Sequence, residues 1–194
     1  MFWTTQINYG VMYLSLITDV FSHKIVGWNL ARTLRAENAL EALKMALSGI
    51  KGKCPELIHH SDRGSQYCCR DYVKLLTSRN IRISMTENGD PLENAVAERI
   101  NGILKTEWLE VYKPSSLKEM VTYVEKVIDL YNNQRPHQSI GYLVPAFIHQ
   151  TGLITERKWK TYYRKGMQGQ EQQGNSASAT PSLRSPAAMQ TQTM

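Results

Sequence analysis

The sequence has few cysteines and no long apolar run. Its three cysteines, Cys54, Cys68 and Cys69, form no CxxC pair. An odd set with two adjacent members is typical neither of a disulfide framework nor of a zinc site, and it favours reduced thiols in the cytoplasm. No apolar run approaches the roughly 18 residues of a membrane-spanning helix. Met1 leads directly into strand-like sequence with no signal peptide, so a cytoplasmic chain without a membrane segment is expected.

The C-terminal stretch has few apolar residues and no hydrophobic periodicity. Residues 166–194 are rich in Gln, Ser, Ala and Thr. This composition buries too little apolar surface to offset the entropy of ordering, so a disordered tail is predicted. A basic extension, residues 153–165, precedes it. Residues 1–152 are long enough to form one domain with a hydrophobic core.

The charge of the chain is positive, with a formal net value of +6 at pH 7. A basic balance favours an anionic partner such as nucleic acid. Because the basic residues are spread along the sequence, a basic protein with no nucleic-acid role remains an equal alternative at this point.

The order of predicted elements indicates an α/β fold. Three strand candidates rich in β-branched and aromatic residues open the chain, and their short connections predict an antiparallel meander. Helices and strands then alternate, which predicts a mixed five-stranded sheet flanked by helices. The predicted strands are 3–10, 11–20, 23–30, 56–62 and 81–86; the predicted helices are 36–50, one that follows Ser65 as N-cap, 94–112 and 117–133; residues 134–152 are expected to be irregular.

Asp62 ends a predicted strand inside "HHSDRGSQY". Active sites gather at the carboxyl ends of strands in open α/β sheets, and Arg63 and Gly64 are expected to turn the chain there. The alternative is that Asp62 only caps this turn. For His59 and His60 a structural role is favoured over a transition-metal site, because no other Cys or His has ligand spacing. His60 shares strand parity with Asp62 and is the better supporting residue.

One face of the predicted helix 94–112 is polar. Its members recur at spacings of four, three and four residues, which keeps them on one side of an α-helix. They are Asn94, Glu98, Asn101 and Lys105. A carboxylate flanked by amides and a lysine suits a surface that handles phosphate, and the alternative is an ordinary solvated helix face.

Four blocks of sequence carry a family resemblance. They are "HHSDRGSQY", the 35 residues between Asp62 and Glu98, "ENGDPLENAVAERINGILKTEW" and "YNNQRPHQSIGYLVPAFIH". Over roughly residues 2–150 the chain resembles the catalytic core of insertion-sequence transposases of the retroviral-integrase-like superfamily. The block "DVFSHKIVGW" is also typical of such cores. The resemblance implies a ribonuclease-H-like fold with an Asp-Asp-Glu triad, in which Asp62 is the second member and Glu98 the third.

The same resemblance implies a reaction and its partners. Such cores cleave and join phosphodiesters with two Mg²⁺ ions, Mn²⁺ being possible, and these hard cations prefer carboxylate oxygens. Asp62 and Glu98 are then the expected metal ligands. The implied partners are DNA, as element ends and target, and further copies of the chain on that DNA. A helix-turn-helix protein from an upstream reading frame is another implied partner, and the implied location is the bacterial cytoplasm, on the nucleoid.

The first triad position is occupied by an amide. Family cores have Trp-x-x-Asp-Ile-Thr-Tyr on the opening strand, and this chain has "WTTQINY" at residues 3–9. Gln6 therefore stands where the first aspartate is expected, near Asp62 and Glu98. A neutral amide cannot replace a charge between two cations, so impaired catalysis is expected. Rescue by Asp19 is less expected than a structural hydrogen-bonding role, and the position of Met1 indicates an N-terminal truncation.

Basic residues near the expected site are candidates for DNA contact. Arg63, Arg99 and Lys105 are the stronger candidates, since phosphate contacts supply most of the affinity in such proteins. Arg135 and His137 flank Pro136, and they either touch DNA phosphates or belong to a turn that packs the C-terminal helix.

Three functions follow as hypotheses. The main one is a transposase core that binds DNA and divalent metal, with catalysis impaired by Gln6. The second is a non-catalytic DNA-binding remnant that inhibits an active transposase in mixed complexes. The third is a metal-dependent nuclease that does not join DNA ends.

Overall fold

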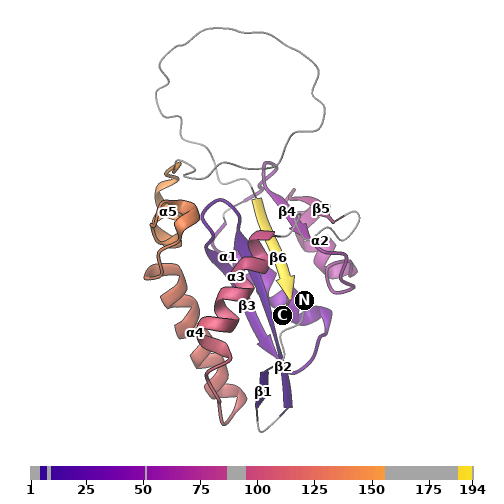
Figure 1. The fold of residues 1–194 in the computed structure, drawn as a ribbon. Helices are drawn as coiled ribbons and strands as arrows, with labels where there is room; N and C mark the ends of the chain where they lie inside the picture. Colours follow the sequence, from indigo (N-terminus) through magenta and orange to yellow (C-terminus); the bar gives the residue numbers. More distant parts are fainter. Residues whose placement is uncertain (1–4, 8–9, 51, 87–94, 156–187, 194) are drawn as a thin grey trace, which may run out of the picture.

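The computed structural model describes residues 5–7, 10–50, 52–86, 95–155 and 188–193. A mixed β-sheet lies between two layers of helices (Figure 1). Helices α1 (Ala36–Ser48) and α2 (Arg70–Ser78) share one hydrophobic cluster with the sheet. Helices α3 (Ala95–Leu104) and α4 (Leu117–Asn133) share the other. The structure is therefore of the predicted α/β class.

The first three strands follow the order expected from their β-branched and aromatic residues. Strand β1 (Thr5–Ile7) pairs with the start of β2 (Gly10–Asp19), and β3 (Ile25–Ala31) pairs with the rest of β2. Both pairings are antiparallel. Strand β1 has three residues, whereas a strand over residues 3–10 was expected; residues 3, 4, 8 and 9 lie outside the described part of the chain.

The next two strands are parallel neighbours joined by a helix. Strands β4 (Ile58–Ser61) and β5 (Arg82–Met85) flank α2 (Arg70–Ser78) in sequence. Ser65 is not the N-cap that was expected, because the helix begins five residues later, with Cys69 in the capping position and no side-chain cap.

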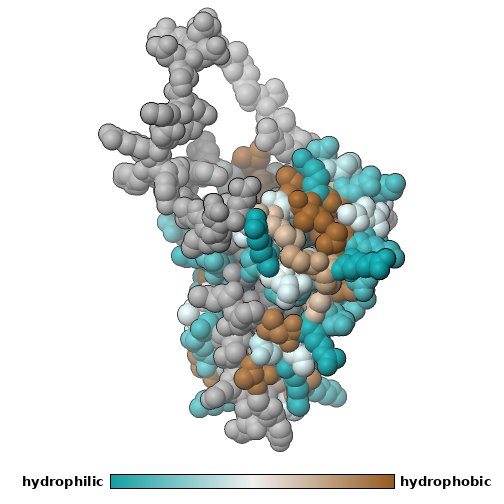
Figure 2. Space-filling model, turned by 90° about the vertical axis from the view of Figure 1, so that its right-hand side faces the viewer, coloured by the Kyte–Doolittle hydropathy of each residue, from teal (hydrophilic) through white to brown (hydrophobic). Residues whose placement is uncertain are grey.

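Figure 2 views the face on the right of Figure 1, where hydrophobic residues gather among hydrophilic ones.

A C-terminal strand completes the sheet. Strand β6 (Ala188–Thr193) lies between β2 and β4, antiparallel to the first and parallel to the second (Figure 1). The sheet thus has six strands rather than the predicted five, and residues 188–193 are not disordered as predicted. Composition failed here because unpaired backbone groups on two neighbouring strands can order a polar segment that has no apolar face of its own. Residues 156–187 and 194 of the predicted extension and tail lie outside the described residues.

Helix α1 (Ala36–Ser48) packs closely on β3. Its buried face combines Leu43 and Leu47 with a row of small residues, namely Ala39, Ala42 and Ala46. A β-carbon on Gly27 of β3 would lie 2.2 Å from the carbonyl oxygen of Ala42. The small residues on both sides therefore let the helix backbone approach the strand.

Helices α3 and α4 cover the other face of the sheet. Helix α3 (Ala95–Leu104) continues into a π-helical turn at Lys105–Leu109, where one continuous α-helix had been expected. Helix α4 (Leu117–Asn133) has the predicted bounds, and the N–H of Glu119 donates to the Ser116 hydroxyl at 3.2 Å as its N-cap. Together with Leu14 and Leu16 of β2, they enclose one hydrophobic cluster.

The segment after α4 is more regular than predicted. It contains a short 3₁₀ turn and helix α5 (Pro145–Thr151). Pro145 stands at the first helical position and Gly152 ends the helix with a φ of 63°. Both are ordinary helix-boundary signals, so this helix was detectable in "VPAFIHQTG". None of the described helices is both long and apolar enough to cross a membrane.

Candidate active site

Asp62 lies where expected, at the carboxyl end of β4. Its Oδ1 accepts a hydrogen bond from the Gly64 N–H at 2.9 Å, so the carboxylate does cap the turn that follows the strand. A β-carbon on Gly64 would lie 2.9 Å from this oxygen and 2.5 Å from Nε2 of the buried Gln66. A larger residue at position 64 would therefore displace the Gln66 and Asp62 side chains. No hydrogen bond from a described residue reaches the second oxygen of the half-buried Asp62.

The two histidines of β4 have structural partners. The Nε2 of His59 lies 3.0 Å from the Tyr72 hydroxyl of α2, and the Nδ1 of His60 lies 3.0 Å from the Ser84 hydroxyl of β5. Burial lowers the pKa of His59 to about 4, so its ring is neutral at neutral pH. The two side chains serve opposite faces of the sheet, as strand alternation requires.

Glu98 lies in the first turn of α3 and its side chain is exposed. The predicted polar face is not continuous, because Asn101 is buried at 7 % exposure. Lys105 is exposed and its ammonium lies 3.4 Å from Glu110, while Asn94 lies outside the described residues. Glu98 is thus placed at the surface, with Asn101 turned into the core beside it.

The carboxylates of the described residues do not form a metal centre. Among the described residues, no group of three or more His, Cys, Asp or Glu side chains is arranged to hold a metal ion. Two cations close together need several oxygen ligands and strong local negative charge. Asp62 and Glu98 alone do not fit that requirement.

The structure does not bring Gln6 beside Asp62. Gln6 pairs with Val11 near the start of β2, and β1 has no pairing with β4 among the described strands. Strand β6 lies between β4 and β2, and its residue Thr191 is the register partner of both Ser61 on β4 and Ile17 on β2. Asp62 is therefore level with Leu16, five residues from Val11, or about 17 Å along the strand at about 3.4 Å per residue.

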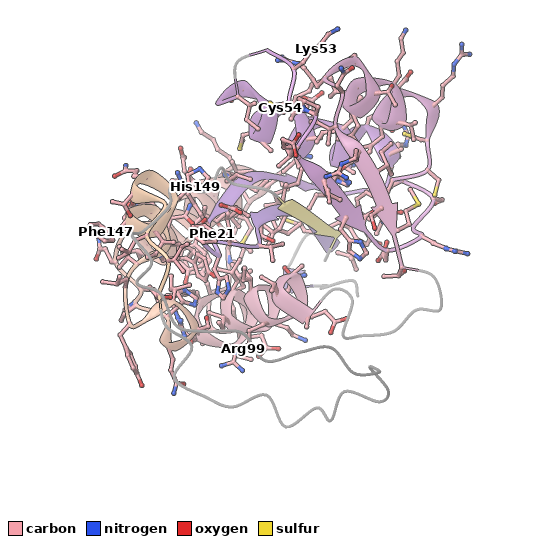
Figure 3. All side chains as sticks on the ribbon, turned by 90° about the horizontal axis from the view of Figure 1, so that it is seen from above. Phe21, Lys53, Cys54, Arg99, Phe147 and His149 are labelled. Atoms are coloured by element: carbon pink, nitrogen blue, oxygen red, sulfur yellow. The ribbon has the colours of Figure 1, made fainter. Side chains whose placement is uncertain are left out.

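Arg63 and Arg99 are exposed, one in the turn after β4 and the other on α3. Figure 3 shows Arg99 on the side of α3 that faces away from the sheet. No ion pair with a carboxylate at 4 Å or less holds either guanidinium within the described part of the chain. Both are therefore able to meet an anionic partner.

Arg135 has a protein partner instead. Its guanidinium donates two hydrogen bonds to Glu107, with Nε at 2.7 Å from Oε2 and Nη2 at 2.5 Å from Oε1. The hydrogen bonds from Arg135 lower the pKa of Glu107, so the pair stays charged. This fork fixes the segment after α4 to the π-helical turn, so the packing alternative describes Arg135 better than a DNA contact does.

His137 is buried, at 6 % exposure, so it cannot meet a DNA phosphate in this conformation. Its ring packs edge-on against Tyr131 and lies 5.9 Å from the ring of His23. Burial, assisted by the nearby charge of Arg135, lowers its pKa to about 4. The packing role again holds, and the DNA-contact prediction for His137 is not supported.

Asp19 has the structural hydrogen-bonding role that was favoured for it. Its buried carboxylate accepts from the Ser22 hydroxyl at 2.7 Å and the Phe21 N–H at 3.1 Å, and its Oδ2 lies 2.9 Å from Nδ1 of His149. Burial opposes the charge, yet these hydrogen bonds hold the pKa of Asp19 below its usual value. The carboxylate thus fastens α5 to the β2–β3 turn, where Figure 3 shows Phe21 and His149 side by side.

The Asp19, Ser22 and His149 cluster is not a nucleophilic triad. In such a triad the histidine uses one ring nitrogen for the acid and the other for the hydroxyl. Here the same Nδ1 lies 2.9 Å from Asp19 and 3.2 Å from the Ser22 hydroxyl, and Ser22 is fully buried. Sequence reasoning missed Ser22 and His149, although both lie in blocks on which the family resemblance rested.

Comparisons with known proteins agree with this fold. The integrase core domain family matches the chain over residues 2–91 and 79–145. An uncharacterized 31 kDa protein of insertion element IS600 from Shigella sonnei is 35% identical over 150 residues, covering 74% of this chain and 55% of that protein. Transposase InsF of insertion sequence IS3A from Escherichia coli K12 is 34% identical, covering 78% and 54%. The chain thus spans about half the length of these relatives.

Solved integrases share the fold at low identity. A chain of the simian T-cell lymphotropic virus intasome, in complex with the PP2A regulatory subunit B56 gamma, superposes with a TM-score of 0.65. It is 16% identical, over 86% of this chain and 58% of that chain. The HTLV-2 integrase catalytic core domain in complex with magnesium gives a TM-score of 0.57 at 17% identity, over 77% and 92%.

Proposed function

Because the chain belongs to the integrase-core superfamily that includes insertion-sequence transposases, we propose that it is a transposase core that binds DNA and has weak or no strand-transfer activity. The observation that carries the proposal is Asp62 at the carboxyl end of β4, without two further carboxylates grouped around it in the described structure. The proposed setting is the bacterial cytoplasm, on nucleoid DNA, since the relatives are bacterial insertion-sequence proteins.

The proposed metal is Mg²⁺, with Mn²⁺ as a substitute. When bound, such ions would activate the attacking oxygen and stabilise the leaving one. Asp62 supplies a half-buried carboxylate and Glu98 an exposed carboxylate, a donor set too small for two ions. We therefore assign this chain weak metal affinity and derive no catalytic step from a bound ion.

DNA binding rests on the exposed basic residues. Arg63 follows Asp62 and Arg99 follows Glu98 in the sequence, and both arginines are exposed. Phosphate neutralisation by such groups gives affinity without sequence preference. The proposal extends to assembly of several copies on paired DNA ends and to a helix-turn-helix partner.

A plasmid assay tests the catalytic part of the proposal. We expect the chain to leave supercoiled plasmid intact with Mg²⁺ or Mn²⁺, at the same level as Asp62→Ala. The reason is that Asp62 and Glu98 supply too few oxygen ligands to hold two cations about 4 Å apart. Robust nicking that disappears in Asp62→Ala would contradict an impaired site, and joined DNA ends would distinguish a transposase from a nuclease.

Binding measurements test the DNA interface. Replacing Arg63 or Arg99 by alanine is expected to weaken DNA binding severalfold for every sequence and to reduce the salt slope by about one. Fluorescence anisotropy with a labelled duplex, measured at salt concentrations from about 50 to about 200 mM, gives both the DNA affinity and its salt slope. Arg135→Ala is the matched control, since its charge is already paired with Glu107. An equal loss of slope in Arg135→Ala would place the interface elsewhere.

A non-catalytic inhibitor is the second candidate, favoured by the same incomplete carboxylate set. A chain that binds DNA ends without cutting them would occupy sites needed by an active relative. Mixing it with an active transposase should lower strand transfer in proportion to the share of this chain.

A further inference from the structure

Two sulfur atoms meet at the end of the sheet that carries Asp62. The thiol sulfur of Cys68 lies 3.8 Å from the thioether sulfur of Met85. Cys68 belongs to the turn between β4 and α2, and Met85 is the last residue of β5. Because the thiol is exposed, a solute can reach the pair from outside.

The backbone holds both sulfur-bearing segments in place. Met85 is the register partner of Ser61 on β4, so it lies at the same end of the sheet as Asp62. The Cys68 N–H donates to the Gly64 carbonyl at 3.4 Å, inside the turn that follows β4. A strand register and a hydrogen-bonded turn therefore set the separation of the two sulfurs.

A buried hydroxyl lies on the same side of the sheet. Register partners on neighbouring strands project to one face, so the Ser61 side chain lies beside that of Met85. Helix α2 covers this face, since His59, two residues before Ser61, lies 3.0 Å from the Tyr72 hydroxyl. The Ser61 hydroxyl is buried without a hydrogen-bond partner in the described structure. It is an unused donor beside the sulfur pair, and a thiolate can accept a hydrogen bond from it.

The chemistry of the pair selects the cation. Thiolate and thioether sulfurs are soft ligands that suit Cu(I), whereas Mg²⁺ prefers carboxylate and water oxygens. Zinc needs four ligands in a structural site, and no group of three or more His, Cys, Asp or Glu side chains is arranged for a metal within the described ranges. Cu(I) accepts two ligands and fits the pair better.

The separation of the sulfurs also fits one bridging ion. Two metal–sulfur bonds of about 2.3 Å, the length found for zinc and thiolate, span at most about 4.6 Å. The observed 3.8 Å lies within that span, so both sulfurs can bind the same ion at a bent angle. The two segments need not move apart or together to admit it.

We propose that Cys68 and Met85 form a binding site for a soft monovalent cation, Cu(I), at the end of the sheet that carries Asp62. The ion replaces the thiol proton, which passes to solvent, and bonds form to the Cys68 thiolate and the Met85 thioether. The thiolate balances the single positive charge of the ion. Binding ties the turn after β4 to the end of β5. This inference uses neither DNA nor Mg²⁺ and does not depend on the proposed function.

Competition with a Cu(I) chelator tests the site. Cu(I), kept reduced by ascorbate in oxygen-free buffer, is shared between bicinchoninate and the full chain carrying Cys54→Ser and Cys69→Ser. We expect this parent to bind a single ion, and Cys68→Ser to lose binding to the chelator. Loss of a supporting group near a metal costs about 10–100-fold in affinity, so Met85→Leu, which removes a direct ligand, should weaken binding at least about tenfold.

The variants are chosen so that the fold survives. Leucine keeps the volume of methionine at position 85, and the Cys68 side chain is exposed. Met45→Leu is the matched control, because Met45 is an exposed methionine on α1, and it should bind Cu(I) as the parent does. Equal affinity in Met85→Leu and the parent would mean that the thiol alone holds the ion, which overturns the proposal. Binding retained in Cys68→Ser would place the ion elsewhere and overturn it as well.

Methionine NMR of the unsubstituted chain decides the role of Met85 directly. The chain has eight methionines, and substoichiometric Cu(I) should shift the methyl resonance of Met85 while that of Met45 stays in place. The spectrum of Met85→Leu identifies the resonance. A Met85 signal that does not move would reject the site. Neither readout involves DNA or catalysis, so failure here is separate from failure of the proposed function.

Discussion

Replacing Gly27 by alanine is expected to destabilise the protein by about 3 kcal/mol, the upper part of the range for overpacked cores. The new β-carbon would lie 2.2 Å from the Ala42 carbonyl oxygen and 2.9 Å from both the backbone N and the β-carbon of Ala46. Two of these three atoms are backbone, so no rotamer change relieves the contact. Helix α1 must move away from β3, which opens the cluster that contains Leu43 and Leu47.

Urea unfolding followed by circular dichroism measures this loss. Gly102→Ala is the matched control, because a β-carbon at this helical position meets nothing within 4 Å. Alanine there is expected to stabilise α3 by about 0.5–1 kcal/mol, as it restricts the unfolded chain. Equal stability of Gly27→Ala and the wild type would mean that α1 does not approach the strand as closely as described.

The sequence predicted most of the scaffold because hydrophobic periodicity reports directly on burial. Helix α4 has the predicted bounds, and β2 and β3 lie within one or two residues of theirs. Helix α1 was found from its leucines, but its contact with β3 depends on Ala39, Ala42 and Ala46, which carry little hydrophobic signal. A glycine inside a strand pattern, such as Gly27, is the available indication of a close backbone approach.

The candidate site was predicted less completely, for reasons that differ between residues. Asp62 was placed correctly because the position of a strand end follows from the local sequence. Gln6 was placed beside it by analogy with the order of family motifs, whereas the pairing of β6 with β2 and β4 depends on contacts between segments far apart in sequence. Strand neighbours of this kind leave no local pattern, so a polar C-terminal segment gave no sign of entering the sheet.

The roles of the charged residues were equally dependent on distant partners. Arg135 and Lys105 were both candidates for DNA contact, but their pairing with Glu107 and Glu110 became visible only in the fold. Arg63 and Arg99 have no such partner in the described residues. The sequence alone identified a set of cations, and the fold divides that set into paired and available members.

Stability is expected to fall steeply between pH 6.5 and pH 4, because three histidines are held neutral in the folded chain. Burial lowers the pKa of His23, His59 and His137, and that of His59 falls from 6.5 to about 4. The unfolded chain therefore binds more protons in this window, and the free energy of unfolding decreases as the pH falls. His59 alone contributes a loss of about 2 kcal/mol between pH 7 and pH 5, and about 3 kcal/mol by pH 4.

Carboxylates do not explain a loss at pH 5 to 6.5. Asp19 and Glu107 have lowered pKa values, so their stabilisation is present above the unfolded values of 3.8 and 4.5 and is lost only below them. Urea unfolding at half-unit pH steps separates the two ranges. His59→Gln should flatten the dependence between pH 7 and pH 5 by about 2 kcal/mol, whatever its effect on absolute stability. An unchanged slope in His59→Gln would mean that the histidine against Tyr72 is solvated, and that β4 and α2 do not enclose it.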